Sequence, residues 1–221
     1  MSEENTISDE NTKATKKYYD YVSVGNRTKQ TAYFVQQHDK NRMFLELLKT
    51  LENKQILVLV KSKRSADGLM EFLNEKGVKS LAIHGNHRAS QIQDAQTTFN
   101  SKETTILITT DRILDTLELT DVNVLVNYDL PLEEADYFKR LRLVDEIGES
   151  ISLIDPEDER TLTSIEMMMK CEMTEVEIEN FEHTNRSQTT TKDKTKKPRH
   201  KKVEQRAKRK AEMKSKWGPS K

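Results

Sequence analysis

The sequence predicts an α/β domain built on a doubly wound, mainly parallel sheet of about six strands, with helices on both faces and disordered tails. Three observations predict this fold class. Short apolar runs of strand length alternate along the chain with amphipathic helical segments. Several of these runs are continuously apolar, which is typical of parallel strands covered on both faces. The apolar pattern then stops after about residue 182.

The first predicted elements lie between residues 31 and 77. The segment 31–36 is rich in aromatic and β-branched residues and predicts a strand. A helix is predicted over 41–52, because apolar residues recur there at helical spacing. The continuously apolar segment 55–60 predicts a buried strand. The segment 64–76 predicts a second helix, which Gly77 closes as a glycine after a helix often does.

The middle of the chain continues the alternation of strand and helix. A strand and its turn are predicted over 81–85, and a helix over 89–100 that ends near Phe99. Two further buried strands are predicted over 105–110 and 122–127.

The last three elements lie between residues 132 and 170. The segment 132–145 predicts a helix, and 149–154 predicts the sixth strand. A final helix is predicted over 156–170, where Pro156 suits a first helical position and acidic residues follow it in the first turn.

Charge is distributed unevenly along the chain. The whole sequence carries 37 basic and 37 acidic residues, yet the segment 191–221 holds 14 lysines and arginines against three acidic residues. Such a basic block is typical of a flexible arm that binds polyanions. We therefore expect a disordered segment over 1–29, with a contact made by its tyrosines, a folded domain over 30–182, and a basic tail over 183–221.

The cysteine count and hydropathy indicate the cellular setting. The single cysteine, Cys171, excludes an internal disulfide and fits a reducing compartment. The sequence has no apolar run near 18 residues and no signal peptide. We expect a soluble, cytoplasmic protein without a membrane partner.

Polar turns follow three of the predicted strands. Ligands of parallel α/β sheets bind beyond the carboxyl ends of the strands, so these turns are candidates for a binding site. A hydroxyl, an ammonium and close backbone approach at a glycine all suit a phosphate. A structural explanation stays open for each: a helix start with Ser65 as N-cap for the first turn, and a plain turn for the second. The candidate residues are Ser62, Lys63, His84, Gly85, Thr110 and Asp111.

The amino-acid sequences of these segments, and their order along the chain, resemble those of one protein family. VLVKSKRSADGL (58–69), IHGN (83–86), TTDRILDTLEL (109–119) and VNYDLP (126–131) resemble segments of the second, C-terminal RecA-like domain of DEAD-box RNA helicases. The resemblance covers about 30–170. It implies a single RecA-like domain, and it implies that the six turn residues line an RNA-binding side.

The helix that follows the HG turn departs from the family pattern. The family carries there a glutamine and an arginine that face RNA and ATP, and this chain has Ala89 and Ile92 instead. In the next segment, the family's arginine, glycine and nucleotide-side aspartate are replaced by Asp115, Thr116 and Glu118. An aspartate in place of an arginine reverses the charge that would face nucleotide phosphates.

The arginine motif of the family is also incomplete. Arg140 matches its first arginine, the later two are missing, and Arg142 lies nearby. Arginines of this kind accelerate phosphoryl transfer by about 10³–10⁵-fold. Arg140 and Arg142 are therefore weak remnants of a catalytic motif, and Glu118 and Arg140 are weak candidates for nucleotide contact.

The sequence lacks the other parts of an ATPase. It contains no G-x-x-x-x-G-K-[ST] phosphate loop and no DEAD-like segment. No cofactor is expected. ATP is expected to bind only if a partner supplies the phosphate-binding domain. The five histidines show no metal-ligand spacing with Cys171 or with each other, so no metal site is expected.

The basic tail is the second candidate for RNA contact. Spaced lysines and arginines neutralise phosphates and release counterions, and a tryptophan can stack on an exposed base. A tail that only increases solubility is the alternative. The candidate residues are Lys201, Lys202, Arg206, Arg209 and Trp217.

Three functional hypotheses follow. The first is a stand-alone, degenerate helicase-like domain that binds RNA or a ribonucleoprotein without hydrolysing ATP. The second is half of an ATP-dependent RNA helicase that works with a separate ATP-binding half. The third is a protein-interaction module that docks through an acidic, methionine-rich helix over 157–182.

Overall fold

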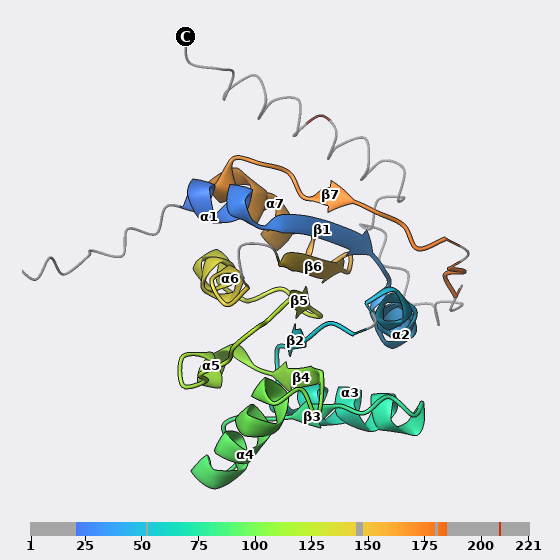
Figure 1. Cartoon of the computed structure of the whole chain (residues 1–221). Helices are drawn as coiled ribbons and strands as arrows, with labels where there is room; N and C mark the ends of the chain where they lie inside the picture. The colour runs from blue at the N-terminus through green and yellow to red at the C-terminus, as the bar shows by residue number, and fades with distance from the viewer. Residues whose placement is uncertain (1–20, 52, 145–147, 180, 185–207, 209–221) are drawn as a thin grey trace, which may run out of the picture.

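The computed structural model describes residues 21–51, 53–144, 148–179, 181–184 and 208. Within this part of the chain, seven parallel strands form one sheet in the order β3-β4-β2-β5-β6-β1-β7, with helices on both sides (Figure 1). The predicted doubly wound parallel sheet is therefore confirmed, with seven strands instead of about six. The strands are β1 (Lys29–Phe34), β2 (Ile56–Leu59), β3 (Leu81–Ala82), β4 (Ile106–Thr109), β5 (Val124–Asn127), β6 (Glu149–Ile154) and β7 (Thr174–Glu175).

Seven α-helices cover the two faces of the sheet in the described residues. Helices α2 and α3 pack on one face, and the other five pack on the opposite face. A short 3₁₀ turn, η1 (Gln37–Asp39), precedes α2. The helices are α1 (Tyr21–Arg27), α2 (Lys40–Thr50), α3 (Lys63–Glu75), α4 (Ala89–Asn100), α5 (Asp111–Leu114), α6 (Glu134–Leu141) and α7 (Glu159–Met169).

Two hydrophobic cores lie on the two sides of the sheet, and the central strands contribute to both. In β2, Leu57 and Leu59 point into the core beneath α5 and α6, whereas Ile56 and Val58 point into the core beneath α2 and α3. All four residues are buried, which explains why the sequence of this strand is apolar at every position.

The amino-terminal boundary differs from the prediction. We expected disorder over 1–29, but α1 spans Tyr21–Arg27, and residues 1–20 lie outside the described part. The Tyr21 ring packs on Phe138 with centroids 4.3 Å apart, so the expected tyrosine contact is present. Gly25 is buried against α7, where an added Cβ would lie only 2.6 Å from the Cβ of Met169. Tertiary packing therefore orders a segment whose composition is polar.

The carboxyl-terminal boundary also differs. The final helix was predicted over 156–170 and is observed at Glu159–Met169. The longer docking helix expected over 157–182 is not formed, because Lys170 adopts a left-handed conformation with φ of 53° and ends α7. The chain then forms β7, and Phe181 packs against the core beneath α2. The contacts reach Thr184, two residues beyond the expected end of the domain. None of the described helices has the length and apolar character required to cross a membrane.

Candidate nucleic-acid interface

Three polar turns lie together at the carboxyl edge of the sheet. They follow β2, β3 and β4, and β4 pairs in parallel with both of its neighbours. The Lys63 Nζ donates a hydrogen bond to the Asn86 side-chain oxygen, which links the turns after β2 and β3. A Cβ placed on Gly85 would lie 3.7 Å from the Arg112 Cδ, so the turns after β3 and β4 are also in contact. The three turns form one continuous polar surface.

Ser62 combines exposure with a structural role. Its Oγ accepts a hydrogen bond from the backbone N–H of Ser65 at 3.1 Å and lies 2.8 Å from the Ser65 Oγ. Ser62 is therefore the N-cap of α3, and the assignment of that role to Ser65 is wrong. Ser62 stays exposed at the edge, where its hydroxyl can also reach a phosphate.

The His84 side chain is buried inside the domain and holds the second turn in place. Its side chain is only 6% exposed, and Nε2 lies 3.0 Å from a carboxylate oxygen of Asp67. The His84 ring also packs against the ring of His87, with centroids 4.2 Å apart. The exposed residues of this turn are Gly85 and Asn86. His84 therefore positions the turn, while its neighbours present the surface.

Asp111 and Arg140 form an internal ion pair. Nε and Nη2 of Arg140 each donate to one carboxylate oxygen of Asp111, both at 2.6 Å. Nη1 donates to the side chain of Asn127 at 2.9 Å and to the carbonyl oxygen of Asp129 at 2.8 Å. Arg140 is fully buried. Four of its five N–H donors are used inside the domain, so it holds the third turn in place.

Several basic residues of this surface were not predicted. Sequence reasoning selected Lys63 from the family pattern, but Lys61, Arg64, Arg88 and Arg112 are also exposed beside the turns. Each lies within three residues of a predicted contact. Their positions could have indicated them, because any residue that directly follows a predicted parallel strand lies at the carboxyl edge of the sheet.

Arg88 occupies an unfavourable position for helix stability. It is the N-cap of α4, yet a guanidinium has no acceptor for the first amides and adds positive charge to the positive end of the helix dipole. The Gln91 side chain compensates in part by accepting from the Arg88 backbone N–H at 2.9 Å. Helix stability therefore does not explain an arginine at this position.

Thr110 is buried, unlike Asp115 and Glu118, two of the residues expected near a nucleotide. Thr110 is the N-cap of α5 but makes no capping bond with its side chain. Asp115 and Glu118 are exposed, and the Glu118 carbonyl accepts from Asn100 on α4. Arg142 follows α6 and is half-buried.

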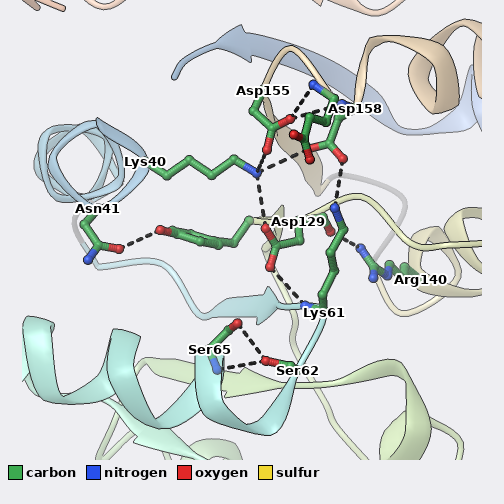
Figure 2. A network of polar contacts seen from close by, with 11 residues as sticks. Lys40, Asn41, Lys61, Ser62, Ser65, Asp129, Arg140, Asp155 and Asp158 are labelled. Carbon is green, nitrogen blue, oxygen red and sulfur yellow. Dashed lines mark hydrogen bonds and ion pairs between the residues drawn. The ribbon is translucent and has the colours of Figure 1, made fainter. Parts of the chain in front are cut away.

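A buried charge cluster lies next to the turns, after β5 and β6 (Figure 2). The Lys40 side chain is fully buried, and its Nζ lies 3.2 Å from Asp129, 3.1 Å from Asp155 and 3.2 Å from Asp158. Lys61 completes the cluster through Asp158 at 3.1 Å. Sequence reasoning missed Lys40, because lysines are rarely buried completely and nothing local marks this one.

The charge cluster fixes the first turn. Burial alone would lower the pKa of Lys40, but Asp129, Asp158 and Asp155 raise it above the ordinary lysine value, so the ammonium stays charged. With Lys40 bound to one oxygen of Asp129, the other oxygen accepts from the backbone N–H of Lys61 at 3.0 Å. The buried lysine thereby positions the chain immediately before Ser62.

Two expectations remain, one about RNA contacts in the basic tail and one about a metal site. The tail candidates Lys201, Lys202, Arg206, Arg209 and Trp217 lie outside the described residues. In the described part of the chain, no three His, Cys, Asp or Glu side chains are grouped to hold a metal ion.

Comparison with known proteins supports the family resemblance. Residues 39–142 match the helicase conserved C-terminal domain. The ATP-dependent RNA helicase vasa of Drosophila melanogaster is 31% identical over 157 residues, which are 67% of this chain and 24% of that protein. The ATP-dependent RNA helicase SUB2-2 of Vanderwaltozyma polyspora is 31% identical over 136 residues, which are 60% of this chain and 31% of that protein. The chain thus spans about a quarter to a third of these relatives.

Solved structures show the same fold. A DEAD box protein from the hyperthermophile Methanococcus jannaschii superimposes with a TM-score of 0.65 and 29% identity, covering 69% of this chain and 43% of that one. The C-terminal domain of the DEAD-box protein Dbp5 has a TM-score of 0.65 and 23% identity, covering 69% of this chain and 92% of that domain. The predicted resemblance to the C-terminal RecA-like domain of DEAD-box helicases is confirmed.

Proposed function

We propose that this chain binds RNA through the three turns after β2, β3 and β4 and through its basic segment 191–221, without hydrolysing ATP on its own. One observation carries the proposal. Four basic side chains surround the turns besides Lys61, which is paired with Asp158. Of the two carboxylates among them, Asp111 is paired with Arg140 and Asp67 is hydrogen-bonded to His84. The surface therefore offers positive charge, hydroxyls and backbone groups to a phosphate chain.

The internal role of Arg140 supports the absence of ATP hydrolysis. Binding a γ-phosphate through Arg140 would first require breaking four hydrogen bonds inside the domain. Asp115 and Glu118 add negative charge to the nucleotide side, where a triphosphate would be repelled. The sequence also contains no glycine-rich phosphate loop.

RNA binding by the turns is tested with single substitutions. Lys63→Ala and Arg112→Ala are expected to weaken binding of a fluorescent single-stranded RNA in anisotropy titrations. Each should also reduce the slope of log K against log salt by about 0.7, the value for one lost phosphate contact on a single strand. Lys79→Ala is the matched control, because Lys79 is an exposed lysine at the amino end of β3. Equal losses in all three variants would contradict a site at the carboxyl edge.

The absence of ATP hydrolysis is tested with the same preparation. Phosphate release with saturating RNA is expected to stay at the level of a blank without protein. Turnover well above that level would contradict the proposal.

A second candidate function is half of an ATP-dependent helicase that works with a separate ATP-binding domain. The observation that favours it is that the relatives named ATP-dependent RNA helicases are three to four times longer than the matched region. RNA-stimulated ATP turnover that appears only when such a domain is added to this chain would support it. Arg140→Lys would then be expected to lower the rate.

A protein partner is the third candidate. Domains of this fold are found with protein partners in the structures of Escherichia coli SrmB bound to RraA and of the Dbp5 C-terminal domain bound to Gle1 and IP6. The methionine-rich segment offers a limited surface for one, since Met169 and Met173 are buried in the core and Met167 is 46% exposed.

A further inference from the structure

Three consecutive residues at the junction of η1 and α2 bind three different parts of the domain. Asp39 binds Thr184, which lies beyond β7 in the sequence. Lys40 binds the carboxylates that follow β5 and β6. The Asn41 side chain accepts a hydrogen bond from the Tyr128 hydroxyl at 2.5 Å. Because η1 follows β1 directly, this junction lies at the same carboxyl edge of the sheet as the polar turns.

The Asp39 carboxylate binds donors with both of its oxygens. One oxygen accepts from the Thr184 hydroxyl at 2.6 Å and from Arg42 at 2.9 Å. The other accepts from the Thr184 backbone N–H at 2.9 Å and lies 3.6 Å from the His38 Nε2. The Asp39 side chain is only 1% exposed, so water can replace a lost donor only if residue 39 moves. We call these contacts the Thr184 anchor.

Residues 181–184 form the outer side of the anchor. The Phe181 ring packs against the core beneath α2, and the Arg42 guanidinium lies 5.4 Å from its centroid. Burial alone would raise the pKa of Asp39, but the bonds from Thr184, the charge of His38 and the bond from Arg42 lower it below the ordinary aspartate value. The carboxylate therefore stays charged and holds an otherwise exposed segment on the surface of the domain.

The charge cluster continues from this junction to the turn after β2. In the sheet order three strand spacings separate β1 from β2, which is about 14 Å at about 4.8 Å each. Figure 2 shows the Lys40 side chain reaching from α2 towards Asp129, Asp155 and Asp158. Asp129 accepts from the Lys61 backbone N–H at 3.0 Å, and Asp158 accepts from the Lys61 ammonium at 3.1 Å. Ion pairs therefore bridge the whole distance.

The anchor and the charge cluster meet in one peptide group. Asp39 and Lys40 are adjacent, with Cα atoms about 3.8 Å apart, and both side chains are buried. A movement that brings water to the Asp39 carboxylate therefore also moves the Lys40 ammonium. That ammonium lies 3.1–3.2 Å from three carboxylates, and an ion pair repays its burial only while its geometry is kept.

We propose that the Thr184 anchor positions the turn after β2 for RNA, so that release of Thr184 from Asp39 weakens RNA binding at Ser62 and Lys63. The inference rests on the proposed RNA binding and adds a point of control outside the RNA surface. Asp39 is then a positioning residue, which acts on the turn through Lys40 and the charge cluster.

Hydrogen exchange tests the coupling without RNA. In the full chain, Thr184→Val removes one donor to Asp39. The Lys61 amide should then exchange about two- to fivefold faster by NMR, the upper value being the factor for one hydrogen bond of typical net strength. The Ile83 amide, which donates to the Ile108 carbonyl at 2.9 Å, is the internal control and should not change. Equal acceleration at both amides, or none at Lys61, would overturn the proposal.

Asp39→Asn is the stronger perturbation. Because both oxygens of Asp39 accept hydrogen bonds, the amino group of an asparagine would face a donor in either orientation. The Lys61 amide should therefore exchange faster in this variant than in Thr184→Val. The reverse order would contradict a path through Asp39.

RNA affinity tests the functional consequence. In anisotropy titrations with a fluorescent oligouridine, Thr184→Val should weaken binding about two- to fivefold, in line with one lost hydrogen bond. Thr184→Ser keeps the hydroxyl and should bind like the unmodified chain. Thr97→Val is the matched control, since the Thr97 hydroxyl donates to a carbonyl of its own helix.

Two double variants locate the effect on the RNA surface. The loss caused by Thr184→Val should largely disappear in a Lys63→Ala background, because the contact that the anchor positions is already absent. The same loss should persist in an Arg112→Ala background, where the turn after β2 is intact. Equal losses in both backgrounds would refute the coupling while RNA binding stands. An unmodified chain that binds no oligouridine would instead refute the proposed function, and exchange at Lys61 would still decide the positioning role.

Discussion

Removing the buried ammonium of Lys40 should unbalance the charge cluster. Lys40→Met keeps an unbranched side chain one atom shorter than lysine but leaves Asp129, Asp155 and Asp158 with Lys61 as their remaining cation. Loss of one partner from a buried ion pair typically costs about 3–5 kcal/mol. We expect a loss of that size in the free energy of unfolding at pH 7, measured by urea denaturation followed by circular dichroism.

The pH dependence gives this prediction a sign. The pKa of Lys40 is raised on folding, so its contribution is present below the unfolded value of about 10.4 and is lost only as pH rises beyond it. Burial would raise the pKa of Asp155, but Lys40 and two backbone amides lower it, so its contribution is present above about pH 4 and is lost as pH falls. The deficit of Lys40→Met should therefore be large between pH 7 and about pH 4, and it should shrink as the pH falls below 4.

Two comparisons sharpen the test. Lys49→Met removes an exposed lysine paired with exposed Glu46 and should cost about 0.5 kcal/mol or less. Adding Asp155→Asn to Lys40→Met should recover part of the lost stability, because one uncompensated charge disappears. A deficit below about 1 kcal/mol at pH 7, or one that stays constant as the pH falls well below 4, would show that the ammonium does not hold these carboxylates together.

Other substitutions test the turn support and the glycines. Arg140→Met should destabilise the fold by about 2–4 kcal/mol in urea denaturation, because its buried acceptors lose their donor. Gly68→Ala should stabilise α3 by about 0.5–1 kcal/mol, since an added Cβ meets open space, whereas Gly77→Ala should destabilise by about 1 kcal/mol because φ is 77°. Thermal denaturation compares the two, and equal effects would contradict the helix end at 75. Gly25→Ala should cost about 1–3 kcal/mol, because its Cβ would lie 2.6 Å from a carbon of α7.

The sequence was most informative where one physical effect dominates a segment. Strand β2 needs apolar residues on both faces, so an uninterrupted apolar run identified it to within one residue at each end. Gly77 identified the end of α3 for an equally local reason, because its positive φ is costly for other residues.

The sequence was least informative where distant contacts decide the structure. Helix α1 forms because Gly25 fits against Met169 and because the Gln30 side chain donates to the Gly25 carbonyl at 2.5 Å. Strand β7 has only two residues, Thr174 and Glu175, which are too few to form a recognisable strand pattern. Gly25 and Met169 are 144 residues apart in sequence, and β7 pairs with a strand about 140 residues earlier, so local patterns cannot reveal these contacts.

The candidate site was predicted in part. The three turns were located correctly, because they follow strands that could be identified. The individual roles were harder to assign: His84 faces Asp67 inside the domain, and Asp111 faces Arg140. Whether a polar side chain at a turn points towards solvent or inwards depends on a partner elsewhere in the chain.

Both borders of the sheet end in a very short strand. On one side β3 has two residues, Leu81–Ala82, and on the other β7 has two, Thr174–Glu175. Each leaves only a brief row of backbone amides and carbonyls to which a foreign strand could add. Self-association by strand pairing is therefore disfavoured, and the protein should resist fibril growth from these borders even when it is concentrated on a polymer.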